Sequence, residues 1–119
     1  MRFYGRVAMD DTYAGMALAN AEGDRLARLL GNRNVLMMGN HGILVAGPSI
    51  AQAFDEMYYF ERAAETLMTC YASNRPLRIA SHEVAQATAQ QWLDYPHLAE
   101  DHLAEIKAIL DREAPDYRD

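Results

Sequence analysis

The chain has 119 residues, of which 50% are hydrophobic and 24% are charged, and its formal net charge is −6; this composition is typical of a single globular domain. No stretch gathers Lys and Arg densely enough to neutralise a run of phosphates, and the acidity disfavours an anionic membrane surface, so we expect neither nucleic acid nor a membrane as a partner. No apolar run approaches the roughly 20 residues that span a bilayer, the N-terminus lacks the apolar segment of a signal peptide, and the single cysteine, Cys70, cannot form an internal disulfide. A cytoplasmic location is therefore predicted.

The N-terminal part of the chain predicts a strand, a turn and a short helix. Residues 3–7 alternate aromatic residues with small or polar ones, which favours a strand, and the stretch from Asp10 to Gly15 is turn-like. Asn20 is placed to cap a helix with its side-chain oxygen, and Gly31 stands where a left-handed residue would end it. The leucines between them share one stripe, which predicts a short amphipathic helix.

Two compact apolar runs, residues 35–38 and 43–46, follow this helix. The link between them, Gly39-Asn40-His41-Gly42, is rich in residues that tolerate positive φ, as a tight hairpin requires. Gly47-Pro48 ends the second run. We therefore predict two paired, buried strands with His41 at the bend that joins them.

The rest of the chain predicts three helices. Ser49 caps a long helix and Ser81 caps the next, while Asn74-Arg75-Pro76 and Tyr95-Pro96 interrupt the helical pattern. The final helix carries apolar residues at positions 98, 103, 106 and 110, and the polar tail from Ala114 is expected to fray. The long helix is expected to bury one face, made of Ile50, Ala53, Phe54, Met57, Ala64, Leu67, Met68 and Tyr71, with Glu56, Glu61, Arg62 and Glu65 largely elsewhere.

Three short strands beneath so long a helix would leave unpaired edge groups and uncovered apolar surface. Another copy of the chain or another segment is expected to cover them, and we therefore predict self-association.

His41 is the first candidate for chemistry, because it stands at a strand end in a glycine-flanked turn where a ligand could approach the backbone closely. Neutral imidazole is a good ligand for zinc and similar divalent ions. The alternative is that His41 bonds a neighbouring carbonyl and only shapes the turn. From the turn alone, this structural role is favoured.

The other three histidines are weaker candidates. His82 lies at a helix start beside Glu83, where solvation is expected, and His97 and His102 are five residues apart, not the four of helical two-histidine metal motifs. A metal site built on these three histidines remains an alternative. The other groups considered are expected to be structural: a solvated acidic surface at Asp94, Glu100 and Asp101, and an inert thiol at Cys70.

Between residues 35 and 63 several motifs follow one another in order. They are an apolar strand, the Asn40-His41-Gly42 turn, a second apolar strand ending in Gly47, a helix with the pair Ala53-Phe54, and a later Phe60-Glu61. This ordered set strongly resembles the class II aldolase/adducin family, and the resemblance extends from about Phe3 to about Leu93.

The resemblance implies a three-layer α/β/α sandwich with a mainly antiparallel sheet. Enzymes of this family cleave, form or epimerise sugar phosphates with a divalent metal, usually zinc. The metal is held by an upstream His-x-His pair and by the histidine of the Asn-His-Gly turn, and an acidic residue further upstream is the acid/base. His41 matches the third metal ligand, the implied substrate is a sugar phosphate, and the implied assembly is a homo-oligomer.

The sequence departs from the family pattern because it contains no His-x-His pair. We interpret residues 1–119 as one partial class II aldolase/adducin-like domain, truncated at its N-terminus. One imidazole is fewer than the three ligands that a catalytic zinc ordinarily has, so no catalytic residue is assigned. Two hypotheses follow. The first is an aldolase-like protein that is inactive alone and binds a divalent metal, zinc, only if another segment completes the site; the second is a non-catalytic interaction module of the adducin type.

Overall fold

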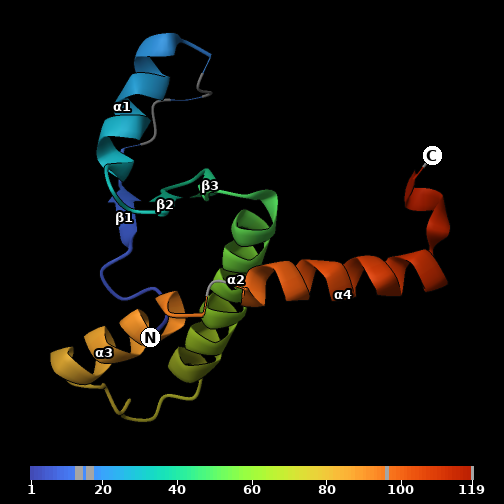
Figure 1. Cartoon of the computed structure of the whole chain (residues 1–119). Helices are drawn as coiled ribbons and strands as arrows, with labels where there is room; N and C mark the ends of the chain where they lie inside the picture. The colour runs from blue at the N-terminus through green and yellow to red at the C-terminus, as the bar shows by residue number, and fades with distance from the viewer. Residues whose placement is uncertain (13–14, 16–17, 96, 119) are drawn as a thin grey trace.

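The computed structural model describes residues 1–12, 15, 18–95 and 97–118. Within these residues the chain forms one three-stranded sheet and four α-helices, so the predicted α/β class is confirmed. Figure 1 shows the elements in chain order: β1 (Val7–Asp10), α1 (Asn20–Leu30), β2 (Val35–Met38), β3 (Gly42–Val45), α2 (Ile50–Ala72), α3 (His82–Leu93), α4 (Leu98–Glu113) and the 3₁₀-helix η1 (Pro115–Arg118).

The sheet is mixed, which corrects the expectation of a mainly antiparallel one. Its strand order is β1-β2-β3, with β1 parallel to β2 and β2 antiparallel to β3. The connections explain this pattern. A tight turn joins β2 to β3 and reverses the chain, whereas α1 lies between β1 and β2 and returns the chain in the same direction.

The predicted strand at residues 3–7 is wrong, because the strand begins where that prediction ends, at Val7. Residues before it fold into turns: the amide of Tyr4 donates to the carbonyl of Met1, and Gly5 has φ +70°. The Phe3 ring packs edge-on against the Phe60 ring at 5.0 Å, so its apolar character serves packing between segments rather than a strand. Asp10 belongs to β1, and the predicted turn after it includes residues 13 and 14, which lie outside the described residues.

The helix ends agree with the sequence at most positions. Ser49 accepts a hydrogen bond from the Gln52 amide at 3.1 Å, and Ser81 caps α3 in the same way. Gly31 ends α1 with φ +56°. Asn20, however, is the first residue of α1 rather than its cap, and no side chain caps that helix.

The C-terminal tail is more ordered than the sequence predicts. The sequence predicts a frayed tail from Ala114, but Pro115–Arg118 forms η1, held to α4 by the Tyr117 hydroxyl, which donates to Asp111 at 2.5 Å. Pro96, half of the predicted break before α4, lies outside the described residues.

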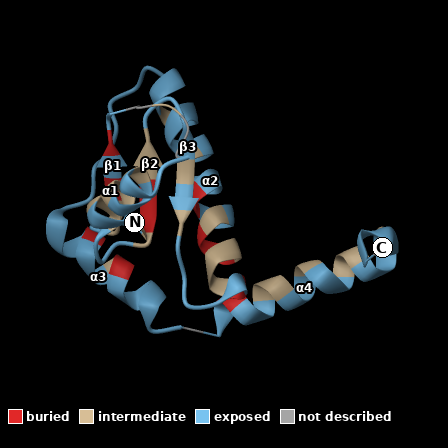
Figure 2. Ribbon diagram, turned by 90° about the horizontal axis from the view of Figure 1, so that it is seen from above, coloured by how far each residue is buried: buried red, intermediate tan, exposed pale blue. Residues whose placement is uncertain are grey.

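The core is small, and Figure 2 shows buried positions on the strands and on α2. Val35 and Leu36 are fully buried on β2, and Ala8 of β1 and Ala51 and Phe60 of α2 are also buried. The predicted apolar face of α2 is not the buried one. Its members at the two ends, Ile50, Leu67, Met68 and Tyr71, are exposed, and the buried residues of α2 are Ala51, Asp55, Glu56 and Phe60.

Helix α4 projects from the rest of the molecule, as Figures 1 and 2 show from two directions. It contacts α2 near its N-terminal end and η1 near its C-terminal end. The radius of gyration is 16.9 Å, against about 13.5 Å for a compact domain of this length. Among the described residues no helix has the length and apolar character needed to cross a membrane.

Candidate functional site

The turn that carries His41 has the predicted hairpin geometry. It joins β2 to β3, Asn40 has φ +58°, and the amide of His41 donates to the carbonyl of Met38 at 3.1 Å. The His41 residue itself is exposed. The hairpin and the position of His41 at its bend are therefore confirmed. The predicted burial of both strands is wrong for β3, whose four residues are exposed or only partly buried.

The end of β1 lies beside this turn. Because β1 and β2 are parallel, their carboxyl ends meet at one edge of the sheet, where Asp10 pairs with Met38. The amide of Gly39 donates to the carbonyl of Asp10 at 2.7 Å, and a Cβ at Gly39 would lie 3.3 Å from that same oxygen. The close approach ties the start of the His41 turn to the end of β1.

The Asp10 carboxylate at this edge is already fully engaged. Arg25 of α1 donates to both of its oxygens, at 3.2 and 2.5 Å, and the amide of Thr12 donates at 3.0 Å. Arg25 also pairs with Glu22 at 2.8 Å. The hydrogen bonds from Arg25 hold the pKa of Asp10 below its ordinary value, so this carboxylate is an ionised structural group and not a proton donor.

The described residues do not supply a complete metal centre. Across 1–12, 15, 18–95 and 97–118, no three side chains of the types that bind metals come together in a suitable group. His82 lies 2.7 Å from the Tyr4 hydroxyl, His102 lies 2.7 Å from Asp55, and His97 precedes α4. The three histidines are thus spread over separate contacts, and the alternative of a site built on them has no geometric support.

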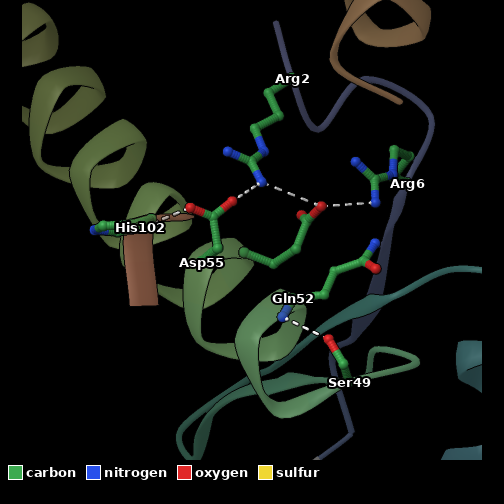
Figure 3. Close-up of polar contacts among 7 residues, drawn as sticks. Arg2, Arg6, Ser49, Gln52, Asp55 and His102 are labelled. Atoms are coloured by element: carbon green, nitrogen blue, oxygen red, sulfur yellow. Dashed lines mark hydrogen bonds and ion pairs between the residues drawn. The ribbon is translucent and has the colours of Figure 1, made fainter. Parts of the chain in front are cut away.

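A buried cluster of charged side chains lies on α2, away from the His41 turn. Asp55 and Glu56 each have side chains that are only 3% exposed. Arg2 pairs with both of them, and Arg6 donates to Glu56 at 2.9 Å. His102 of α4 completes the cluster through its 2.7 Å contact with Asp55, as Figure 3 shows.

Aromatic rings enclose this charge cluster. The Arg2 guanidinium lies 4.9 Å from the Tyr59 ring centre and 5.1 Å from that of Trp92, which is within cation–π range. The His102 ring lies 4.9 to 5.7 Å from the rings of Phe54, Tyr58 and Tyr59. The cluster therefore links four parts of the chain: the N-terminal turns, α2, α3 and α4.

Three atoms of this cluster have no hydrogen-bond partner: Arg2 Nε, Arg6 Nη1 and Glu56 Oε2. A cavity of about 60 Å³ lies beside Arg2 and Glu56, and Gln52 and Asp55 also line it. That volume admits a few water molecules and no sugar phosphate. We assign the cluster a structural role as the junction between the four segments.

The sequence does not predict this cluster, because Glu56 is expected away from the buried face of its helix, and Arg2, Arg6 and Asp55 are not identified as candidates. A signal was present. Asp55 and Glu56 interrupt an otherwise apolar segment between Phe54 and Met57, and two arginines four residues apart occur near the N-terminus. Buried carboxylates need cationic partners, but the sequence did not indicate that residues more than 45 positions apart would meet.

Comparisons with known proteins agree with this fold. The sequence matches the family described as "Class II Aldolase and Adducin N-terminal domain" over residues 1–68. The structure is similar to a solved aldolase II superfamily protein from Pseudomonas syringae, with a TM-score of 0.83 and 30% sequence identity. The alignment covers 99% of this chain and 47% of that one, so the chain spans about half the length of its structural neighbour. No curated protein matches the sequence.

Proposed function

The chain belongs to the class II aldolase and adducin family, and on this premise we propose that it contributes one ligand, His41, to the divalent metal centre of an aldolase-type lyase that acts on sugar phosphates. The metal would be zinc, and residues outside these 119 would supply the other ligands, so that residues 1–119 form part of one domain. The observation that carries the proposal is the position of His41 in an exposed Asn-His-Gly turn, at the edge of the sheet where β1 also ends.

On this proposal, the isolated chain is expected to be inactive. A catalytic zinc ordinarily has three protein ligands, and among the described residues no group of that size surrounds His41. Asp10, the acidic residue that ends the neighbouring strand, is held by Arg25 and is not available to bind an ion. We therefore assign no step of the reaction to residues of this chain.

Metal binding at His41 is tested by titrating Co²⁺ into isotope-labelled protein and following the imidazole signals of the four histidines. We expect the His41 signals to broaden at a lower Co²⁺ concentration than those of His82, His97 and His102. The variant His41→Ala should abolish the broadening at low Co²⁺ concentration. The matched control is His97→Ala, which removes another exposed histidine and should leave the broadening of the His41 signals unchanged. Broadening that begins at one of the other three histidines before it begins at His41 would contradict the assignment.

The inactivity of the chain alone is tested separately. Purified protein is expected to hold well below one equivalent of zinc and to leave a panel of sugar phosphates uncleaved, with or without added divalent metal. Metal-dependent cleavage by the unaided chain, lost on His41→Ala, would show that the count of ligands is wrong.

A second candidate function is a non-catalytic interaction module of the adducin type. It is favoured by the amount of apolar surface left open, since Ile79 is 89% exposed and Met68 and Tyr71 are each more than 60% exposed. The Co²⁺ titration separates the two candidates, because an interaction module requires no preferential binding at His41.

We also propose that the chain self-associates and works in the cytoplasm. The open apolar surface supports the first proposal, and the single unpaired thiol, Cys70, supports the second. Sedimentation analysis tests self-association, and a monomer at all accessible concentrations would contradict it.

A further inference from the structure

A groove lined by arginines lies along the C-terminal half of α2. Its lining residues come from the N-terminal turns, from α2 between residues 59 and 70, from the loop that leads from α2 to α3, and from α3 itself (Figure 1). The volume of the groove is about 640 Å³. This volume is in the range of small-molecule sites, whereas the 60 Å³ cavity beside Glu56 is not.

The charge of this groove is opposite to the charge of the whole chain. Arg2, Arg62 and Arg78 line it, and none of the described residues that line it is Asp or Glu. The chain as a whole has 17 acidic and 11 basic residues and a net charge of −6. A groove that carries only positive charge attracts an anion, and it does so against the repulsion of the rest of the surface.

Two of the three arginines can bind a ligand. Arg2 is already held by the buried charge cluster. Arg62 pairs with Glu65 at 3.2 Å, but both side chains are more than 60% exposed, so this ion pair is weak and a ligand can replace it. Arg78 is exposed and has no ion pair in the described part of the chain. Guanidinium groups of this kind bind carboxylates and phosphates through paired hydrogen bonds.

Aromatic rings form another part of the lining. The guanidinium carbon of Arg2 lies 4.9 Å from the ring centre of Tyr59 and 5.1 Å from that of Trp92, and the two ring centres are 6.3 Å apart. Tyr59 is 39% exposed and Trp92 is 41% exposed, so part of each residue remains open to a ligand. A flat apolar ring can pack on these side chains, whereas an inorganic ion would leave most of the groove unfilled.

We propose that this groove binds a small aromatic anion, whose carboxylate or phosphate pairs with Arg62 and Arg78 while its ring packs on Tyr59 and Trp92. The lack of carboxylates in the lining, the size of the groove and the open aromatic surface support this proposal. The groove is separate from the proposed metal centre, because neither His41 nor any residue of the sheet is among the described residues that line it. Its test therefore does not depend on metal binding.

The single tryptophan and the single cysteine of the chain, Trp92 and Cys70, both line the groove, so each can report on binding. The probe is phenyl phosphate, titrated into the purified chain while the fluorescence of Trp92 is recorded. We expect a saturable change. Phenyl phosphate should also slow the reaction of Cys70 with a thiol reagent, with the same dependence on concentration. No saturable change in either signal up to about 10 mM phenyl phosphate would overturn the proposal.

Arg78→Gln should raise the Kd for phenyl phosphate about tenfold, because it removes a charged donor from the groove. The matched control is Arg75→Gln, which removes the same charge from the same loop at a position that does not line the groove, and it should leave the Kd unchanged. Circular dichroism checks that both variants are folded. An unchanged Kd in Arg78→Gln, or equal weakening by the two variants, would contradict the assigned site.

The two halves of the probe test the two parts of the ligand. Inorganic phosphate and benzyl alcohol should each bind at least about tenfold more weakly than phenyl phosphate, because each uses only one part of the groove. Benzoate should also bind, and the tighter of benzoate and phenyl phosphate identifies the anionic group that the groove prefers. Inorganic phosphate that binds as tightly as phenyl phosphate would overturn the role of the rings, and benzyl alcohol that does so would overturn the role of the arginines.

Discussion

Asp55 and Glu56 are neighbouring carboxylates with almost no contact with solvent, and their partners come from two other segments of the chain, the N-terminal turns and α4. Removing ions from water is costly, so a buried ion pair adds little net stability relative to apolar residues of the same size. Removing only one partner is different, because it leaves the other charge buried without compensation. The Arg2–Asp55–His102 contacts therefore add little to the total stability, but a substitution that removes one of the three partners should be destabilising.

The variant Asp55→Ala is expected to lower the free energy of unfolding by roughly 3 to 5 kcal/mol, because the Arg2 guanidinium and the His102 imidazole both lose their shared acceptor. Urea unfolding followed by circular dichroism measures the change. Glu105→Ala, on the exposed part of α4, is the control and should change stability by less than about 0.5 kcal/mol. Equal effects of the two variants would contradict the structural role of the cluster.

The Asp10–Arg25 pair gives stability a defined dependence on pH. Since Arg25 lowers the pKa of Asp10 in the folded state, the contribution of this pair is complete above the ordinary aspartate value of about 3.9 and is lost as the pH falls through the lower, folded-state pKa. Arg25→Gln should raise the pKa of Asp10 toward its ordinary value, as measured by carbon-detected NMR titration. Arg28→Gln changes an exposed arginine one turn further along α1 and should leave that pKa where it is.

At the scale of single residues, the sequence predicts what local geometry determines. The position of His41 follows from the Gly and Asn residues of its own turn, and the caps Ser49 and Ser81 follow from residues three positions away. The charge cluster depends on contacts between segments that are 47 to 53 positions apart, which no local pattern contains. Asn20 shows the limit of local reasoning too, because Ala19 takes the cap position in the folded chain.

At the scale of elements, a glycine is required where a Cβ would meet another part of the backbone, and it is not required where the space is open. Gly47 follows β3, and a Cβ there would lie 3.1 Å from the backbone nitrogen of Ala53 in α2. Gly23 lies inside α1, and a Cβ there would meet nothing within 4 Å. The first glycine allows α2 to pack closely against the end of the hairpin, whereas the second only weakens its helix.

Alanine substitutions at these two positions are therefore expected to act in opposite directions. Gly47→Ala should destabilise the protein, because the nearest atoms are backbone and cannot move aside. Gly23→Ala should stabilise it by about 0.5 to 1 kcal/mol, the ordinary gain of Ala over Gly within a helix. Thermal unfolding of the two variants measures both effects. A loss of stability on Gly23→Ala would contradict this expectation, because it would mean that a Cβ at residue 23 meets a neighbouring atom.

The sequence predicts the elements better than their arrangement. Two strands and four helices follow from hydrophobic spacing and capping residues, because both signals are local. The buried face of α2 cannot be predicted in this way, because hydrophobic spacing does not show which apolar residues are covered in the folded chain. Met68 and Tyr71 fit the apolar pattern and are exposed, while Asp55 and Glu56 are buried. The parallel pairing of β1 with β2 also depends on where α1 returns the chain.

At the scale of the whole molecule, the fold buries too little of its apolar surface to be compact. Among the described residues, only Val35 and Leu36 of the larger apolar side chains are completely buried, and the two edge strands of the sheet, β1 and β3, each have one unpaired side. Such edges and surfaces are usually covered by other strands or chains. On the proposed function, residues from outside these 119 would both cover this exposed surface and supply the other ligands of the metal centre.

The projecting α4 helix makes a prediction about molecular size in solution. Small-angle scattering extrapolated to zero concentration should give a radius of gyration well above the roughly 13.5 Å of a compact domain of this length. His102→Ala removes the contact with Asp55 that holds α4 against α2, so it should broaden the distribution of interatomic distances relative to the unchanged chain. The control is His97→Ala, because His97 lies just before α4 and does not make that contact, so this variant should leave the distribution of distances unchanged. A compact value for the unchanged chain would contradict the structure, because it would mean that α4 folds back onto the rest of the molecule.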